Sequence, residues 1–435
     1  MAVSKRSSAV AVLGVASILT TALALGSGAL AAPHHGAAAN KVTITMWNTS
    51  TGPGLVALDK TVAEFNSTHP DIHVNNIFIT QQDQILNKLS TALAVGQEPT
   101  VLVGDVPSNG PQELKSGKMV NLNAWAHKTV DKLIYPKQVA GCVYKGVQFC
   151  IPNGAGDYAL YYNKTEFAQA GIKTPPTTWA QVVADGKKLT DPAKNRYGIY
   201  IPFGTTEWTV WTFEGMLWAN GGQFLNRNNT KALFDSPAGV QALTVWYNCL
   251  YKDKVAPLTS FSTPQNSDGE QAFASGLVAM LIDGSWDLNT FDQAKVNYGV
   301  TYFPAMRQFA TNTGQGSIDV FNTGAAQVKA AETFLQWYLQ PSVQVPENAA
   351  VPGSMTNEPA VNNNPTFIKD QHKYMNVFFG DLKYAHIRPT LVSYPAISAA
   401  LGQQIDEVLY NKETPAQALK IAAQEADQIL KKNGE

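Results

Sequence analysis

An alternation of strand and helix patterns over residues 42–105 restricts the fold of this chain more than any other feature. Residues 42–46, 74–79 and 100–104 have the composition and length of strands. Residues 55–65 place their apolar side chains on one helical face, and a second helix is expected to start at 81–83. This order is typical of a parallel, doubly wound α/β sheet. The residues that follow the strands should gather at one sheet edge.

The first 39 residues have the pattern of a secretory signal peptide. Lys5 and Arg6 precede an apolar run over 9–30, and small residues at 29–31 and 37–39 offer cleavage sites. An uncleaved membrane anchor is the alternative, because the run is long enough to span a bilayer. No cysteine precedes Cys142, so no lipid-anchored form is expected. We expect an exported protein, periplasmic or extracellular.

Length and charge exclude several classes of protein. Roughly 395 residues follow the signal, which is too many for one core and predicts about two domains. Without Lys5 and Arg6, 30 basic residues remain against 33 acidic ones, so the net charge is −3. Nucleic acid is not an expected partner because phosphate binding requires clustered cations. The 9 Trp, 16 Tyr and 18 Phe suit an uncharged polyhydroxy ligand.

The three cysteines fall into two groups. Cys142 and Cys150 flank a predicted hairpin that turns near 145–146, which places them nearly opposite each other. A cross-strand disulfide is therefore predicted in an oxidising compartment. Cys249 lies in the apolar-periodic helix 242–251 and is predicted to be a buried free thiol.

Residues 272–286 combine a short helix, a strand at 278–282 and a turn at 283–285. The turn delivers one large aromatic, Trp286, to a strand end. Strand ends line the ligand crevice of open α/β sheets, which favours ligand contact. The alternative is a core tryptophan after an ordinary strand–helix element.

Catalytic motifs are missing from the sequence. It contains no serine nucleophile elbow, zinc-protease helix, phosphate loop or dinucleotide turn. His69 and His73 flank Pro70, which breaks the helix that joint metal ligation would need. Asp105 and Asp157 are the carboxylates to suspect if the chain is a glycoside hydrolase. We expect no enzyme, no cofactor and no metal.

Five motifs in order resemble the family-1 extracellular solute-binding proteins of ABC transporters, the group that contains maltose-binding protein. These motifs lie at 160–164, 176–179, 218–222, 273–286 and 298–304. The resemblance covers 41–432. It implies a two-lobed, periplasmic-binding-protein-like α/β fold with discontinuous lobes, 41–152 plus 301–324 and 153–300 plus 325–435. Residues 151–156 would be the hinge between lobes that close on a ligand.

The resemblance also implies a ligand site between the lobes. Trp286 would stack on a sugar, and one of Trp208 and Trp211 would line the cleft while the other joins the core. Trp47 is expected to pack inside. Arg388 would pair with Asp157 or bind ligand. The candidate ligand residues are Asn48, Ser50, Gln82, Asp105, Asp157, Trp208, Trp211, Trp286, Arg388 and Tyr394.

The main hypothesis is a substrate-binding component of an ABC importer that takes a neutral mono- or oligosaccharide. Its partners would be the carbohydrate and the permease subunits, and we expect a monomer. A glycerol-phosphate-type binding protein, an exported glycoside hydrolase, and a sensor or adhesin are the alternatives. One arginine among many aromatic residues does not favour a phosphorylated ligand.

Overall fold

The computed structural model describes residues 41–79, 84–258 and 267–435. Residues 41–435 form one compact unit. The predicted signal segment 1–39, the predicted helix start at 81–83 and the candidate Gln82 lie outside the described residues. Within the described ranges, no helix is both long enough and apolar enough to cross a membrane.

The first part of the chain forms the predicted parallel sheet. Its elements are β1 (Val42–Asn48), α1 (Gly52–Thr68), β2 (Ile72–Phe78), α2 (Ile85–Val95) and β3 (Val101–Asp105). Strand β1 lies between β2 and β3 and is parallel to both. The predicted strand–helix–strand–helix–strand order is confirmed.

Helices cover both faces of this sheet. Val101 and Val103 belong to the same buried core as Phe65 of α1. Leu102, which points to the opposite face, lies in a core with Ile85 of α2. Helix α12 (Ala325–Tyr338) adds to the first core. The alternation of side chains in one strand thus accounts for two separate cores, as a doubly wound sheet requires.

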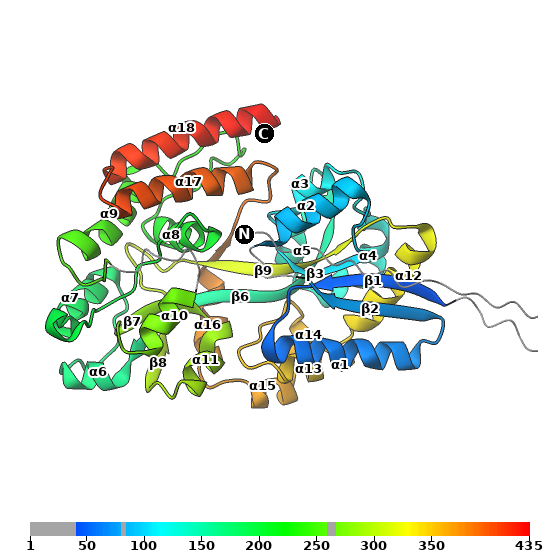
Figure 1. Ribbon diagram of the computed structural model, residues 1–435, viewed down its shortest axis with the longest axis horizontal. Coiled ribbons are helices and arrows are strands. Elements are labelled where there is room, and N and C mark those ends of the chain that lie inside the picture. Colours follow the sequence, from blue (N-terminus) through cyan, green and yellow to red (C-terminus); the bar gives the residue numbers. More distant parts are fainter. Residues whose placement is uncertain (1–40, 80–83, 259–266) are drawn as a thin grey trace, which may run out of the picture. The chain divides into compact units, whose positions relative to one another are not determined.

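Two long strands, β6 (Cys150–Asn163) and β9 (Thr311–Val320), are neighbours in the middle of the sheet. Near one end β9 pairs with β3, and its antiparallel pairing with β6 extends from Cys150 to Asp157. The rest of β6 pairs with two further strands (Figure 1). The glycine-rich segment 151–156 is therefore extended strand. Residues 318–321, whose sequence predicts a strand fragment, include the end of the longer β9.

The second part of the sheet is antiparallel around β6. Strand β7 (Met280–Gly284) and strand β8 (Tyr298–Thr301) flank β6, and the short β10 (Ala385–Ile387) lies parallel to β9. The sheet order is β2-β1-β3-β9-β6-β7, with β8 and β10 as branches.

Four helices form the largest core beside this second part: α8 (Glu207–Ala219), α9 (Pro237–Tyr251), α17 (Tyr394–Leu409) and α18 (Pro415–Asn433). Helices α17 and α18 lie side by side (Figure 1). Thr414 caps α18, as its Thr-Pro-x-x pattern predicts. Gly434 ends it in the left-handed conformation.

The remaining helices are shorter. Helix α7 (Trp179–Leu189) starts after Thr178, a residue type that favours the N-cap position, and Thr178 forms a capping box with Gln181. The others are α3 (Gly110–Leu114), α4 (Asn123–Thr129), α5 (Pro136–Gly141), α6 (Lys164–Gln169), α10 (Ser267–Ala274), α11 (Leu288–Gln293) and α16 (Met375–Asp381). Single turns of 3-10 helix lie at η2 (Asp131–Leu133), η3 (Pro192–Lys194), η4 (Ser285–Asp287) and η5 (Leu382–Tyr384).

Residues 341–365 are rich in Pro, Asn and Ser, a composition that predicts a loop, and this prediction is wrong. This segment contains α13 (Pro341–Ala349) and α14 (Pro359–Asn362), and α15 (Pro365–Asp370) follows directly. Each begins with a proline in its first turn, where proline is compatible with a helix. Apolar side chains from all three helices form one small core. The proline content predicts a loop, but the burial of these apolar side chains stabilises the three short helices.

The hairpin and its cysteines agree with the sequence pattern. Strands β4 (Val143–Tyr144) and β5 (Val147–Gln148) pair through a turn at Lys145 and Gly146, whose φ values are both positive. Cys142 and Cys150 form a disulfide across the base of the hairpin. Cys249 is a buried free thiol, and burial raises its pKa to about 12.

Candidate functional site

Three tryptophans from two distant segments form one aromatic cluster, here called the tryptophan wall. Trp208 and Trp211 are three residues apart on α8, so they share a helical face. Their ring centroids lie 5.4 Å apart, and Trp286 of η4 lies 6.1 Å from each. Trp211 is 7% exposed, whereas Trp286 is 45% exposed. Trp286 therefore offers the open apolar surface of the wall.

The turn that carries Trp286 is tightly held. The Tyr161 hydroxyl donates to the Gly284 carbonyl at 2.6 Å, and the Ser285 hydroxyl donates to the Gly353 carbonyl at 2.7 Å. The Trp286 ring lies directly on the Cα of Gly284, where an added Cβ would come within 2.2 Å of ring carbons. Any larger residue at position 284 would displace the ring.

A half-buried ion pair supports the other side of the wall. The Arg388 guanidinium lies 5.5 Å from the centroid of the Trp211 ring. Its Nη1 donates to Oε1 of Glu207 at 2.8 Å. The Arg388 side chain is 10% exposed and the Glu207 side chain is 38% exposed. The hydroxyls of Tyr394 and Ser398 also donate to the Glu207 carboxylate.

Glu214 extends this network into the core. Asn312 of β9 donates to its Oε2 at 2.6 Å, and Tyr394 donates to its Oε1 at 3.2 Å. Burial raises the pKa of Glu214 well above its ordinary value, and the charge of Glu207 adds to this rise. Arg388, Asn312 and Tyr394 lower the pKa of Glu214 again, in that order. We call Glu207, Glu214, Arg388, Tyr394, Asn312 and Ser398 the arginine network.

A small pocket lies beside Arg388. Its walls come from the residues after β3, from the middle of β9 and from the residues after β10. The lining residues are Pro107, Ser108, Thr313, Gln315, Ile387, Arg388 and Thr390. The Gln315 amide donates to the Gln138 carbonyl at 3.2 Å, while its Oε1 has no hydrogen-bond partner within the described part of the chain. The pocket thus combines hydroxyl and amide groups with one cation.

Several predicted site residues lie away from this surface. Asp157 is fully buried on β6, where its Oδ1 accepts from Thr311 at 3.0 Å. Burial, followed by the charge of Asp381, raises its pKa well above its ordinary value. The predictions that Asp157 faces the cleft and pairs with Arg388 are wrong, because Arg388 pairs with Glu207. Tyr394 is 1% exposed and contacts the arginine network from inside.

The candidates on the first strands lie at or just after the ends of β1 and β3. Asn48 is buried at the end of β1, donates to Asn76 at 2.7 Å and accepts from the Ser50 backbone at 3.1 Å. Ser50 is half-buried in the following loop. Asp105 ends β3 opposite Ser317 of β9. Trp47 packs against a buried core, as expected.

The sequence analysis missed Glu207 and Glu214. Their spacing from Trp211, four residues before and three after, places all three on one helical face. Two acidic residues on the face of a largely buried helix would have indicated a buried cation partner. Thr313 and Gln315 were missed because residues 314–317 resemble a loop, whereas they lie within β9.

Long strands join the two parts of the sheet, and an aromatic wall and a polar pocket lie beside them. This arrangement is typical of a two-lobed α/β binding protein. The chain belongs to the bacterial extracellular solute-binding protein family, whose model matches residues 60–375. Members of this family are exported binding proteins.

Related proteins agree with this assignment. A binding protein of Brucella abortus (strain 2308) is 25% identical over 406 residues, which cover 90% of this chain and 93% of the relative. The maltotriose-binding protein of Pyrococcus abyssi is 20% identical, with 84% and 77% covered. The periplasmic sn-glycerol-3-phosphate-binding protein of Brucella abortus is 24% identical, with 76% of each chain covered.

Solved structures share the fold. A solute-binding protein from Thermotoga lettingae bound to α-D-tagatose has a TM-score of 0.80 at 25% identity and covers 90% of this chain and 100% of its own. The cyclic α-maltosyl-1,6-maltose-binding protein of Arthrobacter globiformis has a TM-score of 0.77 at 25% identity, with the same coverage.

Proposed function

We propose that this protein is the exported ligand-binding component of an ABC importer and that it binds a neutral mono- or oligosaccharide. The tryptophan wall is the observation that carries this proposal. A sugar ring presents an apolar C–H face, which an indole plate matches, and a rim of hydroxyls, which needs polar partners. The 45% exposed Trp286 and the adjacent polar pocket offer both.

Each part of the site would have a separate role. The Trp286 ring, with Trp208 at its edge, would stack on the sugar. Ser108, Thr313 and Gln315 would hydrogen-bond to hydroxyls. Arg388 would orient Trp211 and offer its remaining N–H groups to the ligand. Asn48, Asp157 and Tyr394 are outside the proposed contact set because they do not line this pocket and their side chains bond within the protein.

The proposed lobes are 41–152 plus 301–324 and 153–300 plus 325–435. Strand β6 crosses from the first group to the second at residues 152–153 and pairs there with β9 of the first group, so a change in its backbone angles would move one group against the other. Their pairing is irregular between Asn153 and Ala155, within the proposed hinge 151–156. Asn357 donates to the Gly154 carbonyl at 2.5 Å and would limit this motion.

The protein would be exported and would deliver its ligand to a membrane permease. Residues 1–39 would direct secretion, either as a cleaved signal or as an anchor. The closed, monomeric protein would then dock on transmembrane permease subunits. A sensor or adhesin would bind the ligand without such a permease, so genes for permease subunits next to the gene for this protein are expected.

Two alternatives receive less support. The similarity to a glycerol-3-phosphate-binding protein favours a phosphate ester, but phosphate recognition relies on cations with free donors. Arg388, the cation that lines this pocket, is paired with Glu207. A glycoside hydrolase would need Asp157 at the ligand, whereas Asp157 is buried beneath the sheet surface.

A ligand panel tests the proposal. Purified protein is mixed with mono- and oligosaccharides, sn-glycerol-3-phosphate and amino acids, and its melting temperature and tryptophan fluorescence are recorded. A bound ligand at 100 times its Kd stabilises the native state by about 2.7 kcal/mol, which a thermal shift detects. We expect a carbohydrate to raise the melting temperature. A shift with the phosphate ester and with no carbohydrate would refute the sugar assignment.

A pair of variants localises the site. Trp286→Phe should weaken the fluorescence response and the affinity, because the smaller ring covers less of the sugar. Trp337→Phe is the matched control, since Trp337 packs against the first core on α12. Equal affinities of the two variants would place the site elsewhere.

A further inference from the structure

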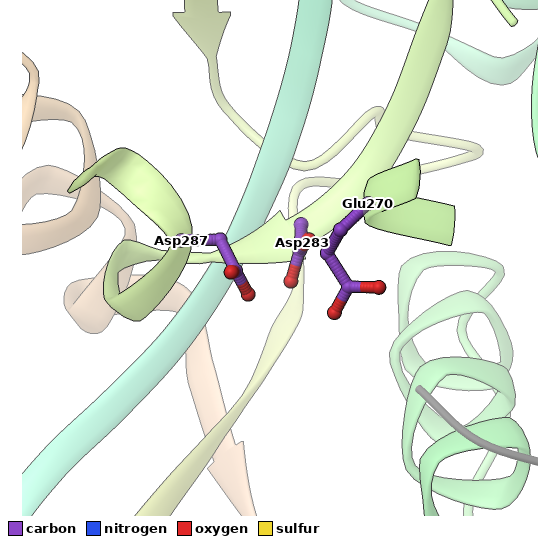
Figure 2. Close-up of side chains that lie close together, drawn as sticks. All are labelled: Glu270, Asp283 and Asp287. Atoms are coloured by element: carbon purple, nitrogen blue, oxygen red, sulfur yellow. The ribbon is translucent and has the colours of Figure 1, made fainter. Parts of the chain in front are cut away.

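Three carboxylates that the sequence analysis did not connect meet beside the tryptophan wall. Glu270 comes from α10, Asp283 from β7 and Asp287 from η4. One oxygen of each lies within 4.8 Å of the others. Figure 2 shows the three side chains on the same side of β7, with Asp283 between the other two. We call these residues the acidic triad.

The middle carboxylate is buried and incompletely bonded. Asp283 is 3% exposed, and its Oδ1 accepts from the Gly284 amide at 2.7 Å. Its Oδ2 and the Oε2 of Glu270 are buried without a hydrogen-bond partner among the described residues. Ionised carboxylates are acceptors only, so they cannot satisfy one another. A buried acceptor of this kind needs a proton or a cation.

Ion pairs do not meet this need in the described part of the chain. None of the ion pairs among the described residues includes a member of the triad. Negative charge is thus concentrated there without a protein cation.

We infer that the acidic triad binds a calcium ion. Carboxylate oxygens are the ligands that hard cations such as Ca²⁺ and Mg²⁺ prefer. Ca²⁺–oxygen distances are about 2.3–2.6 Å, so two oxygens on opposite sides of one ion are about 5 Å apart. The 4.8 Å limit on the oxygen separations fits this span. Mg²⁺ requires shorter distances of about 2.0–2.1 Å and a stricter octahedron.

The ion would join three elements behind the wall. Asp287 follows Trp286 directly in the chain. Calcium would tie α10 to β7 and to η4, and so fix the turn that presents Trp286. The inference concerns this chain's own carboxylates and does not depend on which ligand the wall binds.

Calcium titration of the folded protein tests the inference. The protein is freed of divalent ions with EDTA, dialysed and melted in CaCl₂, in MgCl₂ and in NaCl of equal ionic strength. With a Kd of about 0.1–1 mM, typical of extracellular sites, 10 mM Ca²⁺ should raise the melting temperature by about 2–6 °C. NaCl should have a much smaller effect.

Variants locate the ion. Glu270→Gln and Asp283→Asn should fold and lose most of the calcium shift, whereas the exposed Glu64→Gln on α1 should keep it. An equal calcium shift in all three variants would overturn the assignment. An equal response of the unsubstituted protein to MgCl₂ and CaCl₂ would overturn the choice of calcium.

Terbium luminescence gives a readout independent of stability. Tb³⁺ resembles Ca²⁺ in its ligands, and light absorbed by the adjacent Trp286 should sensitise its emission. Excess Ca²⁺ should reverse the signal, and Glu270→Gln should reduce it at least fivefold. If the protein shows neither terbium emission nor a rise in melting temperature with calcium, the inference is refuted. The carboxylates would then be neutralised by protons that they share. Failure of the sugar panel would leave these signals unchanged, so the two proposals can fail separately.

Discussion

The two ends of the tryptophan wall rest on carboxylates that are neutralised in different ways. Behind Trp211, Glu207 and Glu214 share Arg388 and the donors Tyr394, Asn312 and Ser398. Behind Trp286, the acidic triad has carboxylate oxygens without a partner in the described residues. The Trp211 side is stabilised by charge pairing within the protein. The Trp286 side depends on a proton or a cation that the acidic triad binds from solution.

This difference predicts how each side responds to change. Removal of a partner should damage the arginine network, because an uncompensated buried charge is costly. Removal of a charge should relieve the acidic triad, because its groups repel one another. The stability of the Trp211 side would thus be independent of calcium, whereas the stability of the Trp286 side would change with the calcium concentration and the pH.

Arg388→Met is expected to have one of the two largest effects on stability. The substitution leaves the Glu207 carboxylate with two hydroxyl donors and removes the positive charge of Arg388 from the network that contains Glu214. It should lower the free energy of unfolding by about 2–4 kcal/mol, a range that allows for the partial exposure of Glu207. Urea unfolding measures the loss. Arg307→Met is the control, since Arg307 is exposed and should change stability by less than about 0.5 kcal/mol.

The double variant Arg388→Met, Glu207→Gln sharpens this test. It removes both charges of the pair, so it should recover part of the stability lost in the single variant. An additive result would show that the two charges do not compensate each other, and the contrast between the two sides would fail.

The next effect separates the two ends of the wall. Trp211→Ala should lower stability by about 3–4 kcal/mol, because the ring is buried. Trp286→Ala should cost about 1–2 kcal/mol, because nearly half of its surface is exposed. Trp286→Ala should instead weaken sugar affinity about tenfold or more, measured by calorimetry. A large stability loss with unchanged affinity would return Trp286 to the core interpretation.

Asp283→Asn should show the opposite sign from Arg388→Met. The pKa of Asp283 is raised on folding, so the native state binds its proton more tightly than the unfolded state does. Its contribution to stability is present below a pH of about 4, the unfolded pKa, and is lost as pH rises toward the folded pKa. In EDTA at pH 8, the variant should therefore be more stable than the unsubstituted protein in urea unfolding.

The pH dependence provides the check. The stability difference between Asp283→Asn and the unsubstituted protein should shrink as pH falls from 8 to 5. Asp71→Asn, at an exposed position, should show no such trend. A variant that is less stable than the unsubstituted protein at pH 8 in EDTA would contradict the repulsion assigned to the triad.

The smallest effect is expected from Ser398→Ala. Its hydroxyl donates to Oε2 of Glu207, and Glu207 is exposed enough for water to replace part of that bond. The loss should be about 1 kcal/mol in urea unfolding. Ser67→Ala, at an exposed position on α1, is the control and should be near neutral. Equal losses would show that Ser398 does not belong to the network.

Local patterns predicted much of the fold. Period-two and helical patterns located β1, β2, β3 and α1, and the Thr178 cap placed the start of α7. The ordered motifs identified the two-lobed class. Residues 341–365 were predicted to be a loop because proline and asparagine are frequent there, although proline in a first helical turn does not prevent a helix.

The candidate site was predictable only in part. Trp286, Trp208 and Trp211 were singled out, and the structure brings all three together. Asp157 was expected at the cleft because it follows the proposed hinge, but β6 turns its side chain toward Thr311. In a strand, a shift of one residue moves a side chain to the opposite face, and sequence does not fix that register.

The sequence by itself determined the strand and helix elements, the hairpin with its paired cysteines, and the placement of three tryptophans near strand and helix ends. These features depend on neighbours a few residues away. The tertiary structure alone decided that Arg388 meets Glu207 across 181 residues and that Glu270, Asp283 and Asp287 converge. Charge pairing depends on distances in space, and the packing of elements far apart in the sequence sets those distances. Local sequence patterns therefore do not predict it.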